Sequence, residues 1–137
     1  MALAQISELR RLALPKRAAR LETVLESGLK SLQAQFPDRV SRVSVIGLMG
    51  GIAWRRADGG PDTELSVAIM QEVLRQGILL LPEGEHSEVT GITPPLTITE
   101  TELKRAFREI ARAVSVHLQI SNPAPKPKLS RTPKKRL

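Results

Sequence analysis

Apolar residues recur every three or four positions in four stretches of the chain, the spacing that places them on one face of an α-helix. The predicted helices cover residues 2–14, 15–35, a segment from Asp62 or Thr63 to Gly77, and 100–119. Pro15 lies between the first two predicted helices. It ends the first helix and fits the first turn of the second. The apolar faces are formed by Leu3, Ile6, Leu9 and Leu12; by Leu21, Val24, Leu25, Leu29 and Leu32; by Leu65, Ile69, Met70, Val73 and Leu74; and by Leu103, Phe107, Ile110, Val114 and Leu118.

Shorter β-like runs lie between these helices. Residues 39–56 predict two strands with a bend or bulge between them, because the glycines of Gly47–Gly51 interrupt an apolar run. Residues 78–81 predict a short buried strand ended by Pro82, and residues 88–93 predict a further strand. The order α-α-β-β-α-β-β-α predicts an α+β fold, in which helices cover one face of a small antiparallel sheet.

A local signal marks the start of the last helix. The segment Gly91–Leu103 contains an extended run that ends at Pro94-Pro95, followed by Thr99 three residues before Glu102. A threonine hydroxyl at this position caps a helix, and the glutamate closes a capping box.

The composition is that of one domain with its own hydrophobic core. The 137-residue chain has no cysteine, which excludes disulfides and thiolate metal sites. No apolar run is long enough to span a bilayer. The N-terminus is amphipathic and charged, without the continuous apolar segment of a secretory signal, so we expect a cytoplasmic protein.

The net charge of +7 is concentrated at the C-terminus. Residues 121–137 contain six Lys or Arg, four Pro and no acid, whereas the remaining 15 basic and 14 acidic residues nearly cancel. This predicts a folded domain over 1–120 and a disordered basic tail over 121–137. Such a tail is suited to weak, non-specific polyanion binding, to nucleic acid or an anionic surface. A non-enzymatic binding module with a polybasic tail is therefore an alternative function.

Several segments together resemble the class III pyridoxal-phosphate-dependent aminotransferases. Gly91–Leu103 resembles the family's Pro-Pro-Leu-Thr-Ile-Thr-x-x-Glu-Leu segment near the C-terminus. Val43–Trp54 resembles its glycine-rich double strand, and Gln76–Pro82 resembles its Gly-Leu-Leu-Leu strand after a helix. Arg17–Leu32 resembles the long helix that opens the family's C-terminal domain. The resemblance covers residues 2–119.

The resemblance implies the small C-terminal domain of a fold type I aminotransferase, which transfers an amino group from an amine or amino acid to an oxo acid. In that family the large domain carries the lysine that forms a Schiff base with pyridoxal phosphate. Lys16, Lys30 and Lys104 lie on predicted helix surfaces, so no catalytic or cofactor-binding residue is assigned. The chain alone is expected to be inactive. Its expected partner is a large pyridoxal-phosphate-binding domain, or a second copy bound through an exposed apolar face formed by residues 2–14 and Gly47–Ile52.

One position departs from the family in a way that affects the substrate. Many members that act on amino acids carry an arginine in the strand before the prolines, as Ile-Arg-Phe-x-Pro-Pro-Leu, and such an arginine can bind a carboxylate bidentately. The matching position here is Gly91. Likewise, the family's Val-Arg-Gly is replaced by Val45-Ile46-Gly47. Substrates anchored by a carboxylate at residue 91 are therefore not expected.

Three other features are better explained as structure than as chemistry. The acidic residues and His86 between 83 and 88 offer ligands to a hard metal ion, but nothing fixes a coordination geometry, which favours a solvated turn. His117 lies late in the last helix, where histidine is common. Gly47–Gly51 lacks the Gly-Lys-Ser/Thr of a phosphate-binding loop. We assign no metal site.

Overall fold

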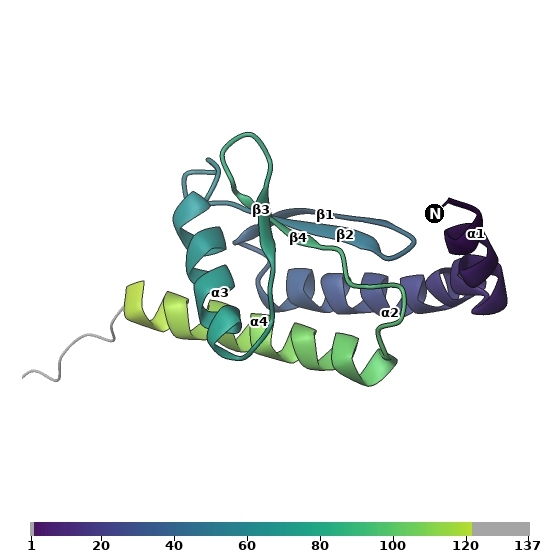
Figure 1. Ribbon diagram of the computed structural model, residues 1–137. Helices are drawn as coiled ribbons and strands as arrows, with labels where there is room; N and C mark the ends of the chain where they lie inside the picture. Colours follow the sequence, from purple (N-terminus) through teal and green to yellow (C-terminus); the bar gives the residue numbers. More distant parts are fainter. Residues whose placement is uncertain (1, 122–137) are drawn as a thin grey trace, which may run out of the picture.

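The computed structural model describes residues 2–121, which form four helices and a four-stranded sheet in the predicted order (Figure 1). The tail predicted over 121–137 lies outside the described residues, apart from Ser121 at the end of the last helix. The elements are α1 (Ala2–Arg11), α2 (Leu14–Gln35), β1 (Val40–Ile46), β2 (Met49–Trp54), α3 (Thr63–Arg75), β3 (Leu81–Glu83), β4 (Val89–Ile92) and α4 (Glu100–Ser121).

The sheet has the strand order β1-β2-β4-β3, and every neighbouring pair is antiparallel. Side chains alternate between the two faces of a sheet, and α2, α3 and α4 pack against one of these faces (Figure 1). The short α1 lies at one end of the molecule beside the start of α2. The predicted α+β class, with an antiparallel sheet and helices on one face, is confirmed.

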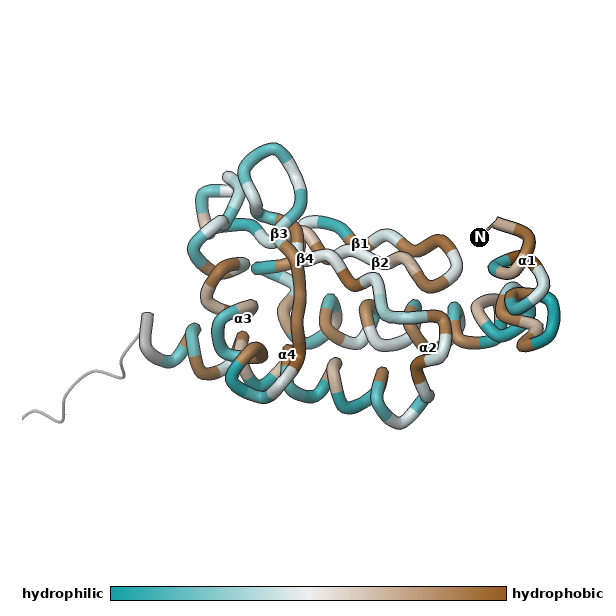
Figure 2. The backbone as a smooth tube through the Cα atoms, viewed as in Figure 1, coloured by the Kyte–Doolittle hydropathy of each residue, from teal (hydrophilic) through white to brown (hydrophobic). Residues whose placement is uncertain are grey.

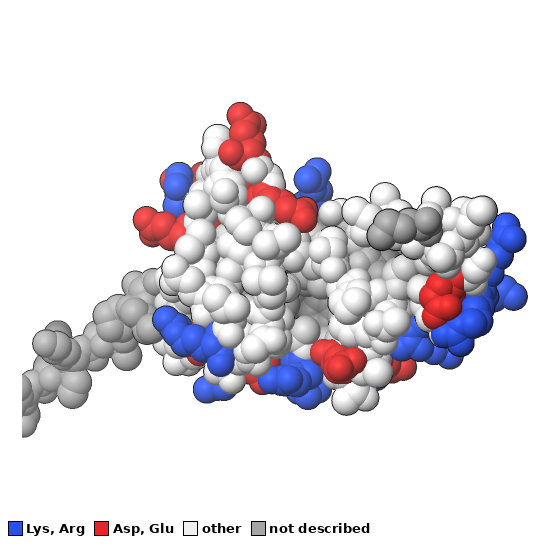
Figure 3. All heavy atoms as spheres, in the orientation of Figure 1, with Lys and Arg blue, Asp and Glu red and all other residues white. Residues whose placement is uncertain are grey.

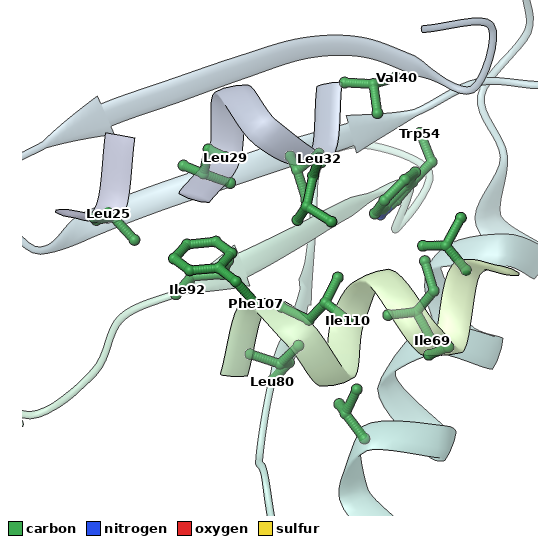
Figure 4. Close-up of a cluster of buried hydrophobic side chains, with 14 of the residues drawn as sticks. Leu25, Leu29, Leu32, Val40, Trp54, Ile69, Leu80, Ile92, Phe107 and Ile110 are labelled. Atoms are coloured by element: carbon green, nitrogen blue, oxygen red, sulfur yellow. The ribbon is translucent and has the colours of Figure 1, made fainter. Parts of the chain in front are cut away.

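The core between the sheet and the helices consists mainly of Leu, Ile and Val (Figure 4). Trp54 is wholly buried, and its Nε1 donates to Thr90 Oγ1 at 2.9 Å. Ser66 Oγ lies 3.3 Å from the same hydroxyl oxygen. This polar cluster satisfies the indole N–H inside the core. Leu74 was expected in the core but is 56% exposed, because it lies on the outer side of α3. The predicted stripes of α2 and α4 supply Leu21, Leu25, Leu29, Leu32, Leu103, Phe107, Ile110 and Val114.

The predicted helix-start signals are confirmed. Thr99 N and Oγ1 donate to Glu102 Oε2 at 2.8 and 2.7 Å, and Glu102 N donates to Thr99 Oγ1 at 3.2 Å. The hydrogen bonds from the Thr99 side chain and backbone lower the pKa of Glu102. Of the two candidate caps of α3, Asp62 is the one used, because its Oδ1 accepts from Leu65 N at 3.0 Å. Gly77 follows α3 with a φ of 78°, as expected for a helix stop.

Two predicted boundaries are wrong. The strand expected over 78–81 begins only at Leu81, is exposed, and contains Pro82 instead of ending before it. Proline is tolerated there because β3 is an edge strand, whose outer N–H groups have no partner within the sheet. The first helix ends at Arg11, and Ala13 adopts a left-handed conformation (φ 49°) ahead of α2, which has its proline in the first turn.

The bend predicted within residues 39–56 is a tight hairpin. Ile46 pairs with Met49, so Gly47 and Leu48 form a two-residue turn, and Gly47 has a φ of 58°. The bulge is separate from this turn and lies at the start of β1. The hairpin tip lies over α2 and points toward the α1 end of the molecule without reaching α1 (Figure 1), and Gly47 N donates to Glu22 Oε1 of α2 at 3.0 Å.

Candidate functional site

The sheet face opposite the helices has two glycines at its centre. Gly50 faces α2, since a Cβ there would lie 3.0 Å from Leu29, and its neighbour Gly51 therefore faces the other side. Gly51 pairs directly with Gly91 of β4. Within residues 2–121, no helix covers this face (Figure 1). We call it the bare sheet face.

A carboxylate occupies the space that a side chain at residue 91 would fill. The Cδ and Cγ atoms of Glu83 lie 2.6 and 3.1 Å from the position of a Cβ on Gly91. The chain therefore places a negative group where the family resemblance implies a cation. Sequence reasoning missed Glu83, because the strand was expected to end before it. The pairing of Glu83 with Val89 and of Leu81 with Gly91 brings the carboxylate to this position.

A cleft of about 610 Å³ adjoins the bare sheet face at the end of β4. Arg17 fixes its loop wall by donating to the backbone carbonyls of residues 96–98, with distances of 3.1 Å to the first two. Arg105 Nη2 fixes the opposite wall by donating to Gln76 O at 2.9 Å. The cleft is mostly apolar, and its lining includes Ile78, Leu79, Leu81, Pro94, Pro95, Ile98, Leu103 and Ala106.

The lysines in the described part of the chain are not placed to carry a cofactor. Lys16, Lys30 and Lys104 are all exposed. The Nζ atoms of Lys30 and Lys104 lie 2.6 Å from the carboxylates of Glu26 and Glu100. A solvated amine in an ion pair is poorly suited to attack an aldehyde, which requires a desolvated or otherwise activated lysine. Residues 2–121 therefore do not fit pyridoxal phosphate, and no catalytic or cofactor-binding residue is assigned among them.

The acidic loop between β3 and β4 is an exposed turn, seen as the red group at the top of Figure 3. Backbone hydrogen bonds, first from the N–H of Glu88 itself and then from that of His86, lower the pKa of the Glu88 carboxyl. The described residues contain no group of three His, Asp or Glu arranged to hold a metal ion. His117 lies half-buried near the end of α4.

Apolar residues occur at the α1 end of the molecule, both on α1 and at the hairpin tip (Figure 2). The exposed apolar face predicted over residues 2–14 and Gly47–Ile52 is found only in part, because Leu48 and Ile52 are buried. On α1, Leu3 is 81% exposed, and on the hairpin tip Ile46 and Met49 are 81% and 65% exposed. Lys and Arg side chains gather at the same end (Figure 3). These exposed apolar side chains are available for contact with another part of an assembly. None of the helices within residues 2–121 is both long and apolar enough to cross a membrane.

This arrangement of a four-stranded antiparallel sheet and helices superposes on part of solved fold type I transaminases. The family model for aminotransferase class-III matches residues 1–114. The chain belongs to the class III aminotransferase family.

Relatives and solved structures agree with this assignment. A putrescine aminotransferase of Pectobacterium atrosepticum is 32% identical over 108 residues, which are 79% of this chain and 22% of that protein. An acetylornithine aminotransferase of Thermosynechococcus vestitus is 33% identical over 92 residues, which are 66% of this chain and 21% of that protein. The chain thus spans about a fifth of the length of these curated relatives.

Among solved structures, a transaminase from the marine bacterium Virgibacillus superposes with a TM-score of 0.76 at 21% identity, covering 87% of this chain and 28% of that one. An Arthrobacter phospholyase in complex with phosphoethanolamine also gives a TM-score of 0.76, at 22% identity, covering 82% of this chain and 27% of that one. These likenesses show the fold.

Proposed function

We propose that this chain is the C-terminal domain of a pyridoxal-phosphate-dependent transaminase and takes part in amino-group transfer only together with a lysine-bearing large domain. The observation that carries the proposal is the match of nearly the whole described fold to about a quarter of a solved transaminase. The bare sheet face and the exposed apolar side chains of α1 and the hairpin tip provide surface for that larger part.

The proposed contribution of the chain is to form one wall of the substrate site. When the bare sheet face meets the large domain, the Glu83 carboxylate beside Gly91 faces the junction. Like charges repel, so this position disfavours a substrate carboxylate and favours an amine donor.

The test is co-expression of the chain with the product of the reading frame upstream of Met1. We expect that frame to encode a lysine-bearing domain, the two products to purify together, and the pair to transaminate an amine donor. Each product alone is expected to be inactive, because neither contains both the lysine and the small-domain wall. A locus without such a frame, or a stable pair without transaminase activity, contradicts the proposal.

A second candidate function, non-specific polyanion binding, is favoured by the six Lys or Arg residues without an acid in 121–137. Deleting residues 122–137 is expected to leave the thermal unfolding midpoint nearly unchanged, since α1 to α4 all remain. It is expected to remove most duplex DNA binding. With about six phosphate contacts, binding by the intact chain falls roughly a thousandfold between 50 and 200 mM salt.

The measurement is a salt titration of DNA binding by the intact and truncated chains. The residual binding of the truncated chain reports on the basic end around α1 and the start of α2, where residues 2–20 contain five Lys or Arg and one acid. Comparable affinity of the two chains at moderate salt places the main binding surface on the folded domain and contradicts a role for the tail.

A further inference from the structure

A second concave surface lies on the helical layer, where α2 and α4 pack closely. A Cβ on Gly28 would lie 2.6 Å from Phe107 Cγ, so only glycine lets the Phe107 ring lie against the α2 backbone at this distance. Beside this contact is a groove of about 680 Å³. We call it the α2–α4 groove. Its floor is apolar and is lined by Val24, Leu32, Phe107 and Ala111.

The rim of the α2–α4 groove carries hydrogen-bond donors that have no acceptor among the described residues. Ser27 and Ser31 of α2 and Arg108 of α4 all line the groove. Within residues 2–121, the Arg108 guanidinium and the Ser27 hydroxyl make no hydrogen bond or ion pair. Ser31 Oγ accepts from Gln35 Nε2 at 3.0 Å, which leaves its own hydrogen available. The Arg108 guanidinium and the hydroxyl hydrogens of Ser27 and Ser31 are therefore available to an acceptor from outside the described part of the chain.

The charged side chains at the rim also favour an anionic ligand. Lys104 and Arg108 line the groove against a single acid, Glu100, which Lys104 already neutralises at 2.6 Å. The hydrogen bond and charge of Lys104, with a smaller contribution from the charge of Arg20, lower the pKa of Glu100. The surroundings thus stabilise negative charge, and Arg108 remains uncompensated. By contrast, Arg112 one turn further along α4 is paired with Glu109 at 3.7 Å.

We propose that the α2–α4 groove binds a small organic oxyanion, with its charged group on Arg108 and the serine hydroxyls and its apolar body against Phe107. A guanidinium and hydroxyl donors suit the oxygens of a carboxylate or a phosphate. The groove volume and apolar floor are in the range of small-molecule sites. This site is built by the helices and not by the bare sheet face, so it does not depend on the proposed transaminase function.

The test is a titration of the full chain followed by backbone amide NMR, with phenyl phosphate, benzoate and inorganic phosphate as separate probes. We expect saturable shifts at Ser27, Gly28 and Ser31. Phenyl phosphate or benzoate should bind more tightly than inorganic phosphate, which has no apolar body to contact Phe107. Whichever of the two aromatic probes binds more tightly identifies the preferred oxyanion.

Arg108→Gln is expected to weaken binding of the better probe about tenfold, the effect of losing one charge-assisted hydrogen bond. Arg112→Gln is the matched control, because it removes an arginine of the same helix that does not line the groove, and it should leave binding unchanged. Both side chains are exposed, so neither change is expected to unfold the chain. Shifts confined to residues beyond 121, or equal binding by the two variants, overturn the proposal.

Discussion

Replacement of Asp62 by alanine is expected to lower the free energy of unfolding by about 3 kcal/mol. Asp62 is only 5% exposed and has two roles. One carboxylate oxygen caps α3 by accepting from Leu65 N, and the other pairs with Arg39 Nη2. Arg39 Nε is already buried without a partner, so loss of Asp62 leaves a partly buried guanidinium uncompensated. The ion pair also joins the start of β1 to the start of α3, which lie 23 residues apart in the sequence.

Urea unfolding measures this loss, with fluorescence of the buried Trp54, the sole tryptophan, as the signal. Asp58→Ala is the control, because it removes a carboxylate whose pair with Arg56, at 3.4 Å, is exposed on both sides. The control should cost less than about 1 kcal/mol. If both variants lose the same free energy, burial of the Arg39–Asp62 pair is not what stabilises this corner of the fold.

The features that were predicted correctly depend on residues that lie close together in the sequence. The capping box of Thr99 and Glu102 spans three residues, so its geometry follows from the sequence alone. The apolar stripe of α2 repeats at helical spacing, and its leucines Leu21–Leu32 are buried as expected. The alternation of helices and strands then allowed only a few layer arrangements, which is why the fold class was predictable.

The features that the sequence did not reveal depend on strand register and long-range packing. The position of Glu83 against Gly91 requires the register of β3 on β4 and a strand that continues through Glu83, whereas the predicted strand ended before Pro82. Because the predicted strand ended before Pro82, the position of this proline within an edge strand was not predicted either. The Arg39–Asp62 pair connects separate elements, and charged residues at such positions look like ordinary surface residues in a sequence.

We propose that the large domain carries the lysine and that this chain forms only a wall of the substrate site. This chain alone is therefore expected to form no internal aldimine and to have no transaminase activity. Schiff-base formation needs an activated amine held beside the cofactor. Lys16, Lys30 and Lys104 are exposed on helix surfaces, and the other four lysines lie in the tail. Each amine is therefore expected to react with the aldehyde only weakly and reversibly. A complete class III transaminase, treated in the same way, is the positive control.

The most direct measurement is borohydride reduction of the chain mixed with pyridoxal phosphate, followed by peptide mapping of labelled lysines. We expect substoichiometric label scattered over exposed lysines, mainly those of residues 121–137, and no transaminase activity. A single stoichiometric site within residues 1–119 would contradict it, because the chain would then hold the cofactor without the large domain.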